Sequence, residues 1–208
     1  MDFFTRPSEE VARDLLGCDI VSVVGDRRCV GRIVETEAYL GPGDEASHAA
    51  ARIGRTTRNE AMFGRPGLAY VYRIYGVHWC LNSVTDAPGY PAAVLIRAAE
   101  PIEGAEVARE RRPGRTDTDL MRGPGNLCRA MGITGSLNMH DLARAPLTIE
   151  VGRAVPDVQV IRGPRIGITK AVDLLLRFHV AGHPCVSRSP GPRRVQGLAI
   201  DTSDPMEP

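Results

Sequence analysis

The spacing of hydrophobic and polar residues predicts many short strands and few helices. A stripe formed by Val11, Leu15 and Leu16 predicts a first helix that begins at residue 8 and stops before Gly17. Residues 19–24 and 29–40 have the composition and alternation of two antiparallel strands joined by a turn. The chain therefore begins as a helix followed by a strand pair.

Later segments repeat this mixture. Apolar alternation and turn residues predict strands at residues 68–74, 77–84, 92–98, 147–151 and 176–180. Capping residues and apolar spacing predict short helices at residues 44–48, 57–63, 102–110 and 126–131. Residues 109–119 are expected to form a mobile loop of mixed charge, and residues 201–208 a disordered tail.

Length and composition favour one loop-rich domain. The chain has 208 residues, of which 43% are hydrophobic and 25% charged, and its 22 glycines and 16 prolines exceed the usual share. We therefore predict an α+β fold. It is a single mixed domain over residues 1–200, with a curved, largely antiparallel sheet, a protruding β-hairpin and peripheral helices.

The spacing of the cysteines and the hydropathy of the chain indicate which cellular compartment to expect. Five widely spaced cysteines, none in a C-x-x-C pair, fit neither a disulfide framework nor a thiolate metal site. The zinc-like spacing of His179, His183 and Cys185 lacks a fourth ligand. The chain has no signal-like start and no long apolar stretch, so we expect a soluble cytoplasmic protein with no membrane contact, metal or cofactor.

Positive charge is concentrated in one region although the net charge is only +1. Residues 46–85 hold five arginines against the single acid Glu60; the arginines are Arg52, Arg55, Arg58, Arg65 and Arg73. A planar guanidinium suits phosphate oxygens, so this segment is a candidate phosphate-binding face. The alternative is that nucleotide bias in the genome favours arginine.

Two carboxylates occupy the second predicted strand. Alternation places Ile33, Glu35, Glu37 and Tyr39 on one face. The two glutamates would lie about 7 Å apart, a separation that suits an acid and a base flanking a water. A solvated strand face is the alternative reading.

Aromatic residues gather in the predicted hairpin of residues 68–84. Tyr70, Tyr72, Tyr75 and Trp79 fall within ten positions. Tyr70 and Trp79 are expected to pack in the core. Tyr75 stands beside a glycine at the turn, where a large exposed ring favours insertion into a partner.

Several motifs together resemble the alkyladenine (3-methyladenine) DNA glycosylase family. The matching segments run from about residue 8 to residue 187, and they are residues 32–42, 44–48, 58–59, 62–63, 70–76, 82, 95–101, 123–128 and 163–167. The resemblance implies an enzyme that flips a damaged purine out of duplex DNA and hydrolyses its N-glycosidic bond.

The resemblance also implies roles for particular residues. Glu37 would be the general base that activates a water, which Arg97 and the backbone carbonyl of Ile166 would help to hold. The flipped base would lie between Tyr39 and His48.

Further implied roles concern the base pocket and the DNA. Tyr72 would close the pocket, and Asn82 would exclude guanine by crowding its 2-amino group. Tyr75, at the turn with Gly76, would fill the space left by the flipped nucleotide. The DNA-binding positions are then Arg52, Arg55, Arg58 and Gly76.

The predicted function is a monomeric, monofunctional glycosylase that acts on alkylated or deaminated purines in base excision repair near the nucleoid. Strand nicking through a Schiff base needs an amine nucleophile, and the chain offers only Lys170 and a Met1-Asp2 start. Two alternatives stay open: a non-catalytic binder of bent or damaged DNA, and a carbohydrate glycoside hydrolase that uses Glu35 and Glu37. The sequence does not rank the lesions 3-methyladenine, 7-methylguanine, hypoxanthine and 1,N6-ethenoadenine.

Overall fold

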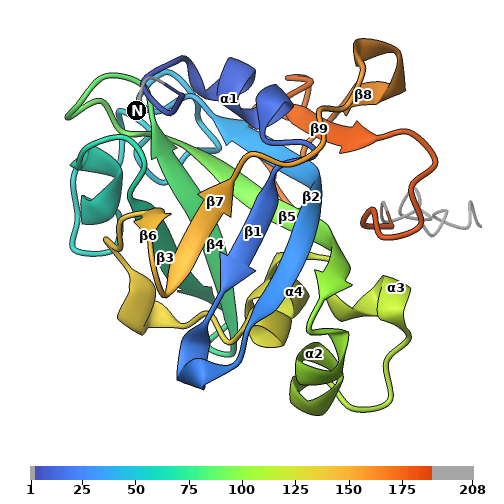
Figure 1. The fold of residues 1–208 in the computed structure, drawn as a ribbon. Helices are drawn as coiled ribbons and strands as arrows, with labels where there is room; N and C mark the ends of the chain where they lie inside the picture. Colours follow the sequence, from blue (N-terminus) through green and yellow to red (C-terminus); the bar gives the residue numbers. More distant parts are fainter. Residues whose placement is uncertain (1–2, 189–208) are drawn as a thin grey trace, which may run out of the picture.

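The computed structural model describes residues 3–188, so the predicted tail and the predicted domain end at residue 200 lie outside the described residues. One antiparallel sheet dominates the fold (Figure 1). Its strands are β1 (Asp19–Ser22), β2 (Cys29–Tyr39), β3 (Ala69–Ile74), β4 (His78–Thr85), β5 (Ala92–Glu103), β6 (Ala143–Arg144), β7 (Leu147–Glu150), β8 (Val160–Gly163) and β9 (Arg177–Val180). The main path runs β3-β4-β5-β2-β1-β7-β6, and β9 joins β2 to β8.

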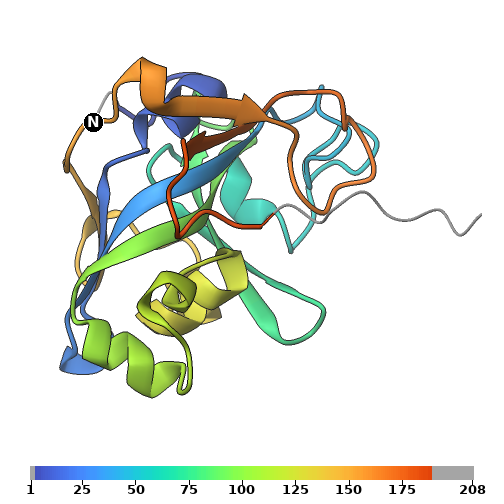
Figure 2. The same ribbon diagram turned by 90° about the vertical axis from the view of Figure 1, so that its right-hand side faces the viewer.

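Short helices surround the curled sheet. They are α1 (Ser8–Asp14), α2 (Ala105–Arg111), α3 (Asp117–Leu120) and α4 (Pro124–Met131), with 3-10 turns η1 (Val24–Asp26), η2 (Glu60–Phe63), η3 (Gly135–Leu137) and η4 (Asp157–Gln159). Helix α1 packs on β2 and β5, while α4 packs on β4 and β5 (Figure 2). The predicted α+β class and the single mixed domain are confirmed. Within residues 3–188 no helix is long and apolar enough to cross a membrane.

The main hydrophobic core joins the sheet to α1 and α4. Leu15 at the end of α1, just after Asp14, Ile33 of β2, Ile96 of β5 and Leu127 of α4 are fully buried in it. Burial of each such side chain stabilises the fold by about 1.5–3 kcal/mol. The core therefore fixes the long central strands β2 and β5, which carry the carboxylates and Arg97.

Two bulges change which side chains share a face of the central strands. Ile33 pairs with Ala99 and Glu35 with Ala98, so Val34 is an extra residue on β2. Thr36 then pairs with Ile96, which leaves Arg97 as an extra residue on β5. Bulges re-aim side chains, and here Ile33 turns into the core. The prediction that Ile33 shares a face with Glu35 and Glu37 is wrong for this reason.

Strand β2 changes its neighbour at the same point. Its first half pairs with β1, and the stretch from Glu35 to Glu37 pairs with β9. The two glutamates are thus flanked by β5, which supplies Arg97, and by β9, which supplies Arg177. A pair of carboxylates that would be solvated on an edge strand is enclosed by basic neighbours.

Two predicted helices before the hairpin need correction. Residues 44–48 form turns rather than a helix, because the Asp44 carboxylate accepts hydrogen bonds from the backbone N–H groups of Leu40 and Ala46. The helix predicted at 57–63, from Thr57 and Glu60 as a capping pair, is only the 3-10 turn η2. The reciprocal hydrogen bonds are made one residue earlier, between Thr56 and Asn59.

The region after β5 also differs from the prediction. The helix predicted at 102–110 starts later, because β5 continues to Glu103 and Gly104 turns the chain with a φ of 68°. The loop predicted at 109–119 shortens, because α2 reaches Arg111 and α3 begins at Asp117. A double hydrogen bond of 2.8 Å from Arg109 to Asp117 joins the two helices.

The predicted hairpin is confirmed and projects from the body of the molecule (Figure 2). Tyr75 and Gly76 at its tip have φ angles of 50° and 69°, and the Val77 N–H donates to the Ile74 carbonyl at 3.1 Å. Two successive positive φ angles suit the right-handed twist of the strands. Glycine adopts this backbone freely, whereas a tyrosine there is strained by about 1–3 kcal/mol.

Candidate active site

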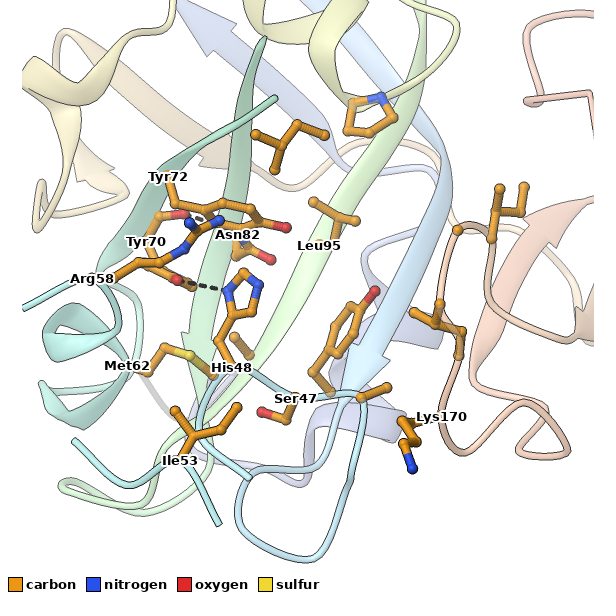
Figure 3. A pocket seen from close by; sticks show the side chains of 18 of the residues that line it. Ser47, His48, Ile53, Arg58, Met62, Tyr70, Tyr72, Asn82, Leu95 and Lys170 are labelled. Atoms are coloured by element: carbon orange, nitrogen blue, oxygen red, sulfur yellow. Dashed lines mark hydrogen bonds between the residues drawn. The ribbon is translucent and has the colours of Figure 1, made fainter. Parts of the chain in front are cut away.

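A pocket of about 690 Å³ opens between the hairpin, the ends of β2 and β5, and the loops around residues 45–53 and 166–170. Figure 3 shows its aromatic side, where His48 points toward Tyr70 and Tyr72. Most residues with a predicted role line this one pocket: Tyr39, His48, Arg52, Arg58, Tyr72, Tyr75, Gly76, Asn82, Arg97 and Ile166.

A hydrogen bond joins two rings of the pocket's aromatic wall. His48 Nδ1 and the Tyr70 hydroxyl lie 2.9 Å apart (Figure 3). The His48 ring meets the Tyr72 ring edge-on with centroids 4.6 Å apart, and the Tyr70 and Tyr72 rings are 5.1 Å apart. Tyr70 is buried as predicted, yet it also orients His48, a role that the sequence did not indicate.

His48 is neutral at physiological pH. Burial, and then the positive charge of Arg58, lower the pKa of His48 to about 4. A flat, uncharged ring accepts a cationic or electron-poor aromatic ligand without electrostatic repulsion. The wall is therefore suited to stacking rather than to proton transfer.

Asn82 is held rigidly beneath the rings. Its Nδ2 donates to the Tyr70 carbonyl at 3.0 Å, and only 3% of the residue is exposed. Its strand β4 lies between β3 and β5. A fixed amide at the pocket floor restricts which edge of a ligand can approach, consistent with the exclusion role expected from the sequence.

Glu37 lies immediately behind the pocket wall and is fully buried. Its Oε1 accepts the Ile166 N–H at 2.7 Å. Its Oε2 accepts the Tyr39 hydroxyl at 3.0 Å and lies 3.2 Å from Arg97 Nη1. All three partners line the pocket, so Glu37 is one layer from it.

Ile166 contacts Glu37 through its backbone N–H, a bond that the sequence did not indicate. The sequence led us to assign its backbone carbonyl to a water, whereas its contact with Glu37 is made by its backbone N–H. This bond orients the carboxylate. The water-holding role of the carbonyl stays a prediction.

Glu35 has a different environment from Glu37. It accepts Arg97 Nε at 3.2 Å, Arg177 Nε at 2.6 Å and the Ser187 N–H at 2.8 Å. It does not line the pocket. Arg97 thus bridges the two carboxylates, and Glu35 holds Arg97 from behind.

The two glutamates differ in proton affinity. Burial raises the pKa of Glu37, and the opposing pull of Arg97 and the Ile166 N–H does not cancel it. Burial acts on Glu35 too, but Arg97 and the Ser187 contacts bring the pKa of Glu35 below its usual value. Because acid-base chemistry uses the group whose pKa lies nearer neutrality, Glu37 is the better proton acceptor.

A buried ion pair fixes the loop that carries Ile166. Arg165 donates to both Asp44 oxygens, at 2.5 and 2.8 Å, and to the Ala38 carbonyl at 3.0 Å. Both side chains are fully buried, and the guanidinium lies 4.7 Å from the centre of the Tyr39 ring. The pair was missed from the sequence because its members are 121 residues apart.

Tyr75 is the most exposed aromatic side chain near the pocket. It is 86% exposed at the hairpin tip, and both Tyr75 and Gly76 border the pocket mouth. Trp79, by contrast, packs partly buried against the core as predicted. A strained, exposed ring beside a pocket is positioned to meet a ligand.

The predicted basic face divides in two. Arg52 and Arg58 line the pocket, and Arg58 lies 5.2 Å from the centre of the Tyr72 ring. Arg55 turns away, pairing with Glu60 at 2.9 Å and lying over the Phe63 ring. Lys170 enters from the opposite side of the pocket (Figure 3).

Within residues 3–188, no group of three or more histidine, cysteine, aspartate or glutamate side chains is arranged to hold a metal ion. His179 lies on β9, paired with Ile161. His183 accepts the Cys185 N–H at 3.2 Å.

Comparison with known proteins identifies the family. The model of the methylpurine-DNA glycosylase family matches residues 2–184. A protein from Methanocella arvoryzae is 51% identical over 91% of this chain and 96% of its own length, and one from Myxococcus xanthus is 48% identical over 92% and 94%. Both are named "Putative 3-methyladenine DNA glycosylase". The resemblance found in the sequence is confirmed, and the chain belongs to the methylpurine-DNA glycosylase family.

Proposed function

We propose that the protein is a monofunctional DNA glycosylase that flips alkylated or deaminated purines out of duplex DNA and hydrolyses the N-glycosidic bond. One observation carries this proposal: Glu37 is buried and oriented directly behind a pocket walled by aromatic rings. The family match supports the same activity, and the names of the relatives support 3-methyladenine as a substrate.

In the proposed reaction a water attacks the sugar C1′ as the base departs. The C1′–N bond breaks with its electron pair going to the base, and a C1′–O bond forms. The Glu37 carboxylate takes the proton of the water, a role that typically accelerates reactions by about 10²–10⁴-fold. Arg97 holds Glu37 in place and faces the pocket.

The base would stack between Tyr39 and His48, with Tyr72 closing the pocket. Stacking of this kind contributes about 1–3 kcal/mol per base. Neutral His48 favours cationic alkylated purines, because it adds no positive charge beside them. Asn82 would exclude normal guanine through its 2-amino group.

Extrusion of a nucleotide costs a few kcal/mol of lost stacking. Tyr75 would offset this cost by filling the vacated space, since its ring is exposed at the projecting tip. Arg52 and Arg58 border the pocket and would contact phosphates beside the flipped nucleotide.

The contacts and the pKa of Glu35 argue against the alternative of a carbohydrate glycoside hydrolase. Two arginines and a backbone N–H occupy that carboxylate, and its pKa is lowered. An acid partner for Glu37 would need the opposite properties.

The proposal is tested with duplex oligonucleotides that contain hypoxanthine, 1,N6-ethenoadenine or methylated purines, with a chelator present. We expect strand cleavage only after alkali treatment, because a monofunctional glycosylase leaves an intact abasic site. Cleavage without alkali would contradict the monofunctional assignment. Binding of damaged duplex without excision of any lesion would favour the non-catalytic alternative.

A further inference from the structure

A second, strongly basic pocket adjoins the candidate active site. It has a volume of about 490 Å³ and is lined by residues of β5, the segment that follows α2, α3, the start of α4, and the chain after β9. Four arginines line it besides Arg97, against one acid, Asp119; they are Arg112, Arg115, Arg122 and Arg188. None of these four belongs to the arginine segment singled out in the sequence.

The two pockets share a wall. Arg97 lines both of them, and the start of α4 separates them, with Pro124 on the first pocket and Gly123 on the second. The backbone of Arg122 also bridges to Ala98, the residue after Arg97. The shared Arg97 and the adjacent residues Gly123 and Pro124 place the two pockets side by side.

The charge in this pocket is poorly neutralised. Arg122 pairs with Asp119 at 2.7 Å, while Arg115 and Arg188 are exposed and form no hydrogen bond or ion pair with residues 3–188. Burial and the positive charges of Arg115 and Arg129 lower the pKa of Arg112. An anion would relieve this repulsion between guanidinium groups.

Unused donors also point to an anion. Arg122 Nε is buried without a hydrogen-bond partner among the described residues. Helix α4 has eight residues and begins at Pro124, and no side chain caps the backbone N–H groups of its first turn. Gly123 and Asn126 at this end line the pocket. Buried donors and helix N-termini both favour negatively charged ligands.

We propose that this basic pocket binds a backbone phosphate of the DNA strand whose nucleotide enters the candidate active site. The inference rests on the proposed function, because it requires DNA to lie across the first pocket. A phosphodiester fits better than a neutral ligand, since planar guanidinium groups match phosphate oxygens. The contact would set the register of the strand without reading its sequence.

The test compares two charge-matched double variants in binding to a lesion-containing duplex over a range of salt concentrations. Arg115→Ala/Arg188→Ala removes two exposed guanidiniums from the pocket. Arg144→Ala/Arg153→Ala removes two exposed guanidiniums that line neither pocket. Each phosphate contact contributes about 0.9 to the slope of log affinity against log salt.

We expect the pocket variant to lower this slope by about 1, the contribution of one phosphate contact, and the control variant to keep the native slope. A methylphosphonate scan of the lesion strand adds a second readout. One neutralised phosphate near the lesion should weaken the native protein but not the pocket variant. Equal slopes for both variants, or an identical methylphosphonate profile, would overturn the inference.

Failure of the proposed function is recognised separately. If the native protein binds the damaged duplex and excises the lesion while the pocket variant keeps the native slope, only the phosphate site is refuted. If the native protein neither binds nor excises any of the lesions, the proposed function itself fails and the phosphate site fails with it.

Discussion

Asp44→Asn tests how the structure fixes the loop that orients Glu37. This substitution would keep the side-chain shape but leave the fully buried Arg165 guanidinium without a counter-charge. Removing one partner of a buried ion pair costs about 3–5 kcal/mol. At about 2–4 °C of melting temperature per kcal/mol for a chain of this size, the variant should melt about 6–20 °C lower.

A neighbouring pair supplies the control. Glu45 lies 3.8 Å from Lys170, and both side chains are more than half exposed. Glu45→Gln should change the free energy of unfolding by less than about 0.5 kcal/mol. Asp44→Asn/Arg165→Met, which also removes the buried cation, should recover part of the lost stability.

Chemical denaturation at several pH values measures these effects. Burial alone would raise the pKa of Asp44, but the hydrogen bonds and charge of Arg165 bring it below its usual value. The pair therefore stabilises the protein fully above the pKa of Asp44 in the unfolded chain. Its contribution is lost as the pH falls through the lower pKa of the folded protein. An Asp44→Asn variant as stable as Glu45→Gln at pH 7 would refute this reasoning.

Further predictions concern the pocket and the hairpin. Tyr75→Ala should change the free energy of unfolding by less than about 0.5 kcal/mol, because the side chain is 86% exposed. The same variant should lose the preference for binding damaged over intact duplex, and a retained preference would exclude insertion of Tyr75. NMR titration of His48 should show no transition between pH 5 and 8, since its pKa is about 4; a midpoint near 6.5 would contradict its burial. The excision rate should decrease as the pH is lowered, because protonated Glu37 cannot accept a proton from water. Since the pKa of Glu37 is raised, this decrease should begin at a higher pH than for a glutamate of ordinary pKa.

Local sequence patterns predicted the parts of the fold that depend on neighbouring residues. Apolar alternation and the Tyr75-Gly76 turn were sufficient to predict the β3–β4 hairpin, because strand pairing across a tight turn depends on residues close in sequence. The same logic failed at Ile33. The paired bulges on β2 and β5 arise from contacts between strands about 60 residues apart, so the alternation of residues within one strand does not predict them.

The candidate site was predictable where residue type signals chemistry. Glu37, the aromatic rings and Arg97 were identified through motifs, and the structure gathers them at one pocket. The supporting contacts were not predictable. Asp44 resembles a helix cap in the sequence, and only its pairing with Arg165 shows that it anchors a distant loop. The basic pocket was likewise not predictable, because its lining residues come from separate parts of the chain between Arg97 and Arg188.

The central claim is that Glu37 activates the water that displaces a damaged purine. Single-turnover excision should be compared for the native protein, Glu37→Gln and the exposed pocket-rim control Glu45→Gln, together with affinity for the lesion duplex. We predict that Glu37→Gln binds the lesion duplex but excises the base about 10²–10⁴-fold more slowly, while Glu45→Gln keeps the native rate. Excision by Glu37→Gln at the native rate would contradict the account.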